Sequence, residues 1–119
     1  MNNKPSSFII DACDVFGNQV TCTYQRWYQH IISGHDEFTD RQSEVAQMIA
    51  NPSVVYSSIS HPDTRYIICN LNTKTGKKYC KIVVHYADGA GKIVTAYTAV
   101  SEGGDNIDQS RKLYPKSNV

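Results

Sequence analysis

The sequence predicts an α+β domain in which two N-terminal helices pack on a four-stranded antiparallel β-sheet, preceded by a short β-hairpin. Apolar residues recur at helical spacing before Pro52, whereas β-branched and aromatic residues dominate after it. The joints between the expected strands are short and rich in turn-forming residues, so consecutive strands should pair in an antiparallel meander. Such a sheet buries one face on the helices and leaves the other face free.

The predicted elements follow one another without long connections. A hairpin opens the chain, because Gly17 and Asn18 supply the positive φ of a two-residue turn between two β-rich runs. Two helical segments follow, from Tyr24 to Gly34, with Thr23 as its cap, and from Thr39 or Asp40 to Asn51. Four strands are then expected: Val54 to Ile59, Arg65 to Leu71, Lys78 to Tyr86 and Lys92 to Ala99.

Length and composition favour one domain with one core. The chain has 119 residues, of which 40% are hydrophobic and 19% charged, and this balance argues against disorder. We expect a single domain over residues 1–119, with a core from about 8 to 99 and a loosely docked polar tail from 100 to 119. Apolar runs are short and the first residues do not resemble a signal peptide, so we expect a cytoplasmic protein with no membrane partner.

The four cysteines do not have the spacing of a zinc site. Cys13, Cys22, Cys69 and Cys80 include no pair at zinc-ligand spacing. A two-residue turn would set Cys13 opposite Cys22, and a four-residue loop would set Cys69 opposite Cys80. In a reducing cytosol such pairs are small apolar core residues. We therefore expect no metal and no other cofactor.

Two histidines near the end of the first helix are candidates for proton transfer. His30, His35 and two carboxylates lie within eight residues, and imidazole exchanges protons near neutral pH. A structural role is the alternative for both residues. A helical histidine beside Trp27 can simply pack, and a histidine at a helix C-terminus complements the helix dipole.

Basic and hydroxyl side chains provide candidate phosphate contacts. The formal net charge of +1 excludes coating of nucleic acid by bulk charge, so a polyanion must meet a local patch. Arg65 opens a strand, and its guanidinium matches phosphate oxygens bidentately. Thr95 and Tyr97 alternate onto one face of the last strand, where both can donate to phosphate. Lysines at hairpin tips, such as Lys78, also serve as solvated edge protection.

The order of these motifs resembles the phage-associated nuclease-like branch of the barnase/EndoU/colicin/RelE (BECR) superfamily. The resemblance spans about residues 8 to 99 and rests on five runs: VTCTYQRWYQHI at 20–31, GHDEF at 34–38, NPSVV at 51–55, KIVV at 81–84 and IVTAY at 93–97. It implies two helices on a four-stranded antiparallel sheet, and a metal-independent endoribonuclease of toxin or phage-effector type. The superfamily's His-Pro-Glu run reads His35-Asp36-Glu37 here, so a carboxylate that would repel phosphate replaces proline.

The resemblance also implies a mechanism, in which the 2′-hydroxyl of RNA attacks phosphorus and leaves a cyclic phosphate. By position, the catalytic set would be His35 or His30, Arg65, Thr95 and Tyr97. Apart from the resemblance, we expect Lys81, His85 and Lys78 to bind substrate. The implied partners are RNA, as tRNA, mRNA or rRNA, and a cognate inhibitor or immunity protein.

This mechanism requires Arg65, Thr95 and Tyr97 to share the free face of the sheet, and a one-residue slip in register would separate them. The alternative hypothesis is a catalytically inactive domain of the same fold that binds a protein or nucleic-acid partner through that face, because a fold does not guarantee an activity.

Overall fold

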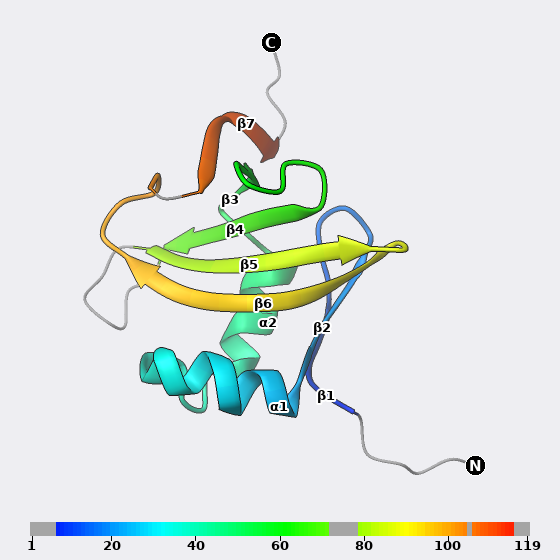
Figure 1. The fold of residues 1–119 in the computed structure, drawn as a ribbon, viewed down its shortest axis with the longest axis vertical. Coiled ribbons are helices and arrows are strands. Elements are labelled where there is room, and N and C mark those ends of the chain that lie inside the picture. Colours follow the sequence, from blue (N-terminus) through cyan, green and yellow to red (C-terminus); the bar gives the residue numbers. More distant parts are fainter. Residues whose placement is uncertain (1–6, 72–78, 105, 116–119) are drawn as a thin grey trace.

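A seven-stranded mixed sheet, in the order β1-β2-β6-β5-β4-β3-β7, forms the centre of the protein (Figure 1). The computed structural model describes residues 7–71, 79–104 and 106–115. The strands are β1 Phe8–Cys13, β2 Gln19–Thr23, β3 Val54–Ser58, β4 Arg65–Leu71, β5 Tyr79–Ala87, β6 Ala90–Ala99 and β7 Ile107–Tyr114. The helical segments are α1 Tyr24–Arg26, η1 Trp27–Ile32, η2 Asp36–Phe38 and α2 Gln42–Ala50.

The predicted four-stranded meander is wrong, because the sheet continues beyond both of its ends. Strands β3 to β6 do pair antiparallel in series. However, β2 adds to β6 through a short parallel ladder and brings β1 with it, so the hairpin belongs to the sheet. At the other end β7 pairs with β3, where a loose tail was expected. The sequence of β7 is polar because residues 109–112 are exposed on an edge strand.

The helices cover one face of this sheet. Thr23 caps the first helix as expected, since its Oγ1 accepts a hydrogen bond from the backbone N–H of Arg26 at 3.1 Å. Figure 1 shows the helix formed by α1 and η1 running beside β6, with α2 packed behind the strands. The buried core between helices and sheet includes Trp27, Ile31, Phe38, Val45, Ile49, Ile68, Ile82, Val84 and Ala96. None of the helices in the described part of the chain is long and apolar enough to cross a membrane.

The opposite face, called the second face below, is not free along its whole length. A smaller buried cluster lies on it, formed by Val54, Tyr56, Ile67, Cys69 and Ile107. The segment between β6 and β7 folds back over this end of the sheet, and the backbone carbonyl of Gly103 accepts a hydrogen bond from the Lys81 ammonium at 2.8 Å. The expectation of a wholly open face is therefore wrong at this end.

The first hairpin turn is longer than predicted, and this changes what faces Cys13. The backbone N–H of Asp14 donates to the carbonyl of Asn18 at 2.9 Å, and the Asp14 carboxylate accepts from the N–H of Asn18 at 2.8 Å. Cys13 therefore lies opposite Gln19 and not opposite Cys22. The same carboxylate accepts a 2.6 Å hydrogen bond from the Tyr86 hydroxyl, which ties the turn to β5.

The second predicted cysteine pair is separated by a shift of one residue. Cys69 lies opposite Lys81, and Cys80 lies opposite Asn70. Because a one-residue shift reverses the face of a side chain, Cys69 and Cys80 lie on opposite sides of the sheet. All four cysteines are free thiols. Burial raises the pKa of Cys69 and the pKa of Cys80 to about 12.

These raised pKa values predict a loss of stability in alkaline solution. An unfolded thiol has a pKa near 8.5, so between about pH 9 and 12 the folded state binds more protons than the unfolded state. The free energy of unfolding should therefore fall as pH rises through this window, by up to about 1.4 kcal/mol per pH unit for each thiol. Urea titrations at several pH values measure the slope. Cys80→Ala should flatten it, whereas exposed Cys13→Ala should not; equal slopes in wild type and Cys80→Ala would contradict the assignment.

Candidate nucleic-acid interface

The pairing register places the strand residues predicted to form a site on the second face. Arg65 lies opposite His85, and Lys81 lies opposite Tyr97. Alternate residues of β5 share a face, so both pairs point away from the helices, and Thr95 joins Tyr97 two residues earlier on β6. The requirement that Arg65, Thr95 and Tyr97 share a face is met by this register.

The structure nevertheless does not bring Arg65 and Tyr97 together. The row of Arg65 crosses β5 at His85, and the row of Tyr97 crosses it at Lys81. These two residues are four positions apart on β5, a distance of about 13 Å at 3.3 Å per residue. Arg65 and Tyr97 also line different pockets, so they do not form one phosphate site here. The second face therefore has two ends, which differ in chemistry.

At one end, basic side chains line a pocket of about 500 Å³, called the cationic groove below. Its basic members are Arg26, Arg65, His85 and Lys92. The other described lining residues are Phe8, Thr21, Cys22, Thr23, Ile93 and Val94, and none of the described lining residues is an acid. Lys92 lies opposite His85, which in turn lies opposite Arg65, so these three form one row across β6, β5 and β4.

Arg65 orients the ring of His85 within this row. The Arg65 Nε donates to His85 Nδ1 at 3.3 Å. A guanidinium only donates, so Nδ1 is the acceptor and the neutral ring carries its proton on Nε2, as assigned from this bond. The Nε2–H is then the remaining hydrogen-bond donor of the ring, and His85 lines the groove together with three cations, a set of groups that favours an anionic oxygen.

An adjoining hollow of about 390 Å³ brings His30 to the same region. It is lined by Thr23, Gln25, Arg26, Gln29 and His30, and it shares Thr23 and Arg26 with the cationic groove. The Thr23 cap fixes the start of the helix that presents both Arg26 and His30. Burial raises the pKa of Cys22 to about 11 and the charge of Arg26 opposes this rise, so the guanidinium acts on the groove wall.

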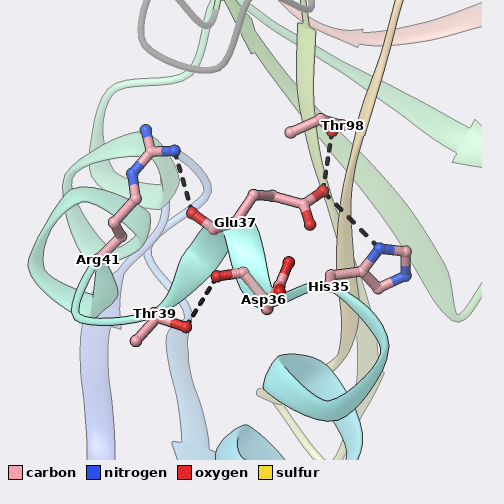
Figure 2. Close-up of polar contacts among 6 residues, drawn as sticks. All are labelled: His35, Asp36, Glu37, Thr39, Arg41 and Thr98. Carbon is pink, nitrogen blue, oxygen red and sulfur yellow. Dashed lines mark hydrogen bonds and ion pairs between the residues drawn. The ribbon is translucent and has the colours of Figure 1, made fainter.

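His35 lies beside Tyr97, near the C-terminal end of β6 and away from the cationic groove. The two ring centroids are 6.3 Å apart. Figure 2 shows the Glu37 carboxylate between Thr98 and His35: its Oε2 accepts from Thr98 Oγ1 at 2.9 Å and lies 3.8 Å from His35 Nδ1. Asp36, which replaces the expected proline, is exposed, so Glu37 rather than Asp36 is the carboxylate paired with His35.

Two groove residues, Arg26 and Lys92, were missed by the sequence reasoning. Strict alternation puts Lys92 on the face opposite to Thr95 and Tyr97. A β-bulge leaves Val94 without a partner, since Val83 pairs with Thr95 and Val84 pairs with Ile93, and it brings Lys92 to the second face. For Arg26, the only indication in the sequence was a basic residue in the first turn of the predicted helix. Lys78, predicted to bind substrate, lies outside the described residues.

The functional evidence comes from the groove, because neither metal-ligand clusters in the described residues nor similarity to known proteins indicates a function. No three His, Cys, Asp or Glu side chains within residues 7–71, 79–104 and 106–115 lie together as possible metal ligands. No family model, no curated protein and no solved structure matches the chain.

The cationic groove predicts stabilisation by inorganic phosphate. A ligand that binds only the folded state adds about 1.4 kcal/mol at ten times its dissociation constant. Thermal unfolding of the wild-type protein should therefore shift upward with phosphate at constant ionic strength. Arg65→Met combined with Lys92→Met should abolish the shift, and Lys112→Met, on exposed β7, should keep it. An equal shift in all three proteins would show that phosphate binds elsewhere.

Proposed function

We propose that this protein is a metal-independent endoribonuclease that holds the RNA backbone in the cationic groove. The observation that carries the proposal is the row of Arg65, His85 and Lys92, joined by Arg26, with no acid among the described lining residues. Arg and Lys contacts to phosphate supply most of the affinity of proteins for nucleic acid. Because the net charge is only +1, binding depends on this local cluster.

The reaction proposed is a transesterification within the RNA. The 2′-oxygen attacks phosphorus, the bond from phosphorus to the 5′-oxygen breaks, and the products are a 2′,3′-cyclic phosphate and a 5′-hydroxyl. One group must remove the 2′ proton and another must protonate the leaving 5′-oxygen. His85 is the proposed acid in its imidazolium form, in which Nδ1 is protonated, the hydrogen bond from Arg65 is released and Nε2–H protonates the leaving 5′-oxygen. The cations that line the groove stabilise the charge that develops on phosphorus.

His30 is the proposed base in place of His35. Its hollow shares Thr23 and Arg26 with the cationic groove, whereas His35 lies beside Tyr97 in the distant row. The proposal includes the toxin or phage-effector role and the inhibitor or immunity partner that the resemblance implies. It also places the protein in the cytoplasm, where RNA is available and thiols remain reduced.

A second candidate function is binding without cleavage. The separation of about 13 Å between the rows of Arg65 and Tyr97 favours it, since the residues expected to act on one phosphate are divided. In that case the groove holds a nucleic-acid or acidic protein partner and no bond is broken.

Cleavage of labelled single-stranded RNA in EDTA tests the proposal. The wild-type protein should release fragments ending in a cyclic phosphate. His85→Gln and His30→Gln should each lower the rate by about 10² to 10⁴, the usual contribution of general acid or base catalysis. His35→Gln, at a histidine that lines neither the cationic groove nor its adjoining hollow, is the matched control and should retain activity. Arg65→Met should weaken binding and cleavage together.

Two other outcomes would contradict the proposal. Tight binding with intact RNA would leave the binding function in its place, and loss of activity in His35→Gln alone would move the chemistry to the row of Tyr97. Far-UV circular dichroism of each variant separates these outcomes from misfolding.

A further inference from the structure

The cationic groove has two walls, which come from different parts of the chain. One wall is the row of Arg65, His85 and Lys92 on strands β4, β5 and β6. The other wall comes from β2 and the helix that follows it, and it includes Thr21 and Arg26. Thr21 lies opposite Lys92, so the walls meet where β2 pairs with β6. The position of Arg26 relative to the row therefore depends on how β2 is held against β6.

The junction between β2 and β6 is short. Its parallel ladder consists of three residue pairs: Gln19 with Ala90, Val20 with Gly91, and Thr21 with Lys92. Ile10 and Val20 of the hairpin are also buried in the core shared with α2. Hydrophobic burial is non-directional, however, and does not fix the position of β2 along β6. A directional contact is needed to fix it.

A group of contacts on the helix side of the sheet, called the turn clasp below, supplies this direction. The Tyr86 hydroxyl donates to Asp14 Oδ2 at 2.6 Å, and Asp14 Oδ1 accepts from the backbone N–H of Phe16 at 2.9 Å. The ring centroids of Tyr66 and Tyr86 are 4.7 Å apart, and those of Phe16 and Tyr66 are 5.5 Å apart. The turn between β1 and β2 is thus bound to both β4 and β5.

Gly91 lets the Tyr86 ring lie directly against the junction of β2 and β6. A Cβ at Gly91 would lie 2.9 Å from Tyr86 Cε1 and 3.1 Å from Val20 Cγ2, closer than such atoms normally pack. The Tyr86 ring and the Val20 side chain therefore both pack on the backbone of Gly91. Burial, followed by the hydrogen bond to Asp14, raises the pKa of Tyr86 above its usual value, so the hydroxyl remains a donor at neutral pH.

The turn clasp lies directly behind the cationic groove. Tyr86 follows His85 on β5, and Gly91 precedes Lys92 on β6. Successive residues of a strand point to opposite faces of the sheet. Tyr86 is not among the described residues that line the groove or its adjoining hollow. Any effect of Tyr86 on what the groove binds must therefore act through the position of the strands.

We propose that Tyr86 is a positioning residue for the cationic groove, which holds β2 in place along β6 and so sets Arg26 against the row that begins at Lys92. This inference rests on the proposed function, because the groove is taken to hold the phosphates of RNA. His30 lines the hollow that adjoins the groove at Arg26, so the turn clasp also sets the proposed base against the proposed acid, His85.

A double-mutant cycle on RNA affinity tests the inference. The probe is a 2′-O-methyl RNA octamer, which cannot be cleaved because its attacking hydroxyl is blocked. Arg26→Met should weaken binding about tenfold in the wild-type background, since a charge-assisted contact is lost, but less than about twofold in the Tyr86→Phe background. Lys92→Met should cost the same factor in both backgrounds. Partial unfolding would lower every affinity alike, so only a positioning role makes Arg26 and Tyr86 non-additive.

Three further variants separate the hydrogen bond from the fold. Asp14→Asn should retain the wild-type affinity, because its amide oxygen can accept from the backbone N–H groups while its amide nitrogen donates to the Tyr86 oxygen. Asp14→Ser keeps a hydroxyl for the turn but does not reach Tyr86, so it should behave like Tyr86→Phe and replaces it if that variant does not fold. Tyr66→Phe removes a hydroxyl from the neighbouring ring and should leave the affinity unchanged.

Amide hydrogen exchange tests the turn clasp without RNA. Tyr86→Phe should speed exchange of the protected amides within residues 19–21 and 90–92 about fivefold, the usual effect of losing one hydrogen bond, and leave the ladder between β4 and β5 unchanged. Faster exchange in a protein that binds no RNA would overturn only the proposed function. Unchanged exchange in these residues, or an equal cost of Arg26→Met in both backgrounds, would overturn the inference even if RNA is bound.

Discussion

One extra residue in β6 decides which side chains meet on the second face. Val94 has no partner in β5, so the alternation of β6 changes between Ile93 and Thr95. Without this bulge Lys92 would lie opposite Tyr86, on the helix side of the sheet. With it, Lys92 completes the row of Arg65 and His85. The cationic groove therefore depends on a local irregularity in pairing.

The sequence allowed prediction of the kinds of element but not of the edges of the sheet. Helical and strand periodicity located the segments around Trp27, Val45 and β3 to β6, because burial on one face leaves a regular pattern. Strand β7 and the joining of the predicted hairpin to the sheet were missed for two reasons. Strand β7 is an exposed polar edge, so its sequence lacks the apolar alternation of a buried strand. Strand β2 joins β6 through a parallel ladder between residues about 70 positions apart, and no local sequence pattern predicts such a pairing.

The candidate site was predictable to a similar degree. Only Thr95 and Tyr97 could be placed on one face from alternation alone, because they lie on the same strand. The face of Arg65 and His85, and the division of these four residues into two rows, could not be predicted, because both follow from the register of β5 against its neighbours. Nor could the covering of Lys81, since it requires the chain after β6 to return over the sheet. Register and chain reversal are properties of the assembled fold, and short sequence runs do not encode them separately.

The parallel ladder between β2 and β6 determines when the cationic groove forms during folding. Arg26 follows β2 directly, whereas Lys92 enters from β6, so the groove closes only after an early and a late part of the chain have met. Contacts of such long sequence separation form at a high entropic cost and after local structure. During synthesis, a ribosome-bound chain that ends before β6 carries Arg26 but lacks Lys92 and the opposite wall, so the basic surface is complete only after β6 has been made.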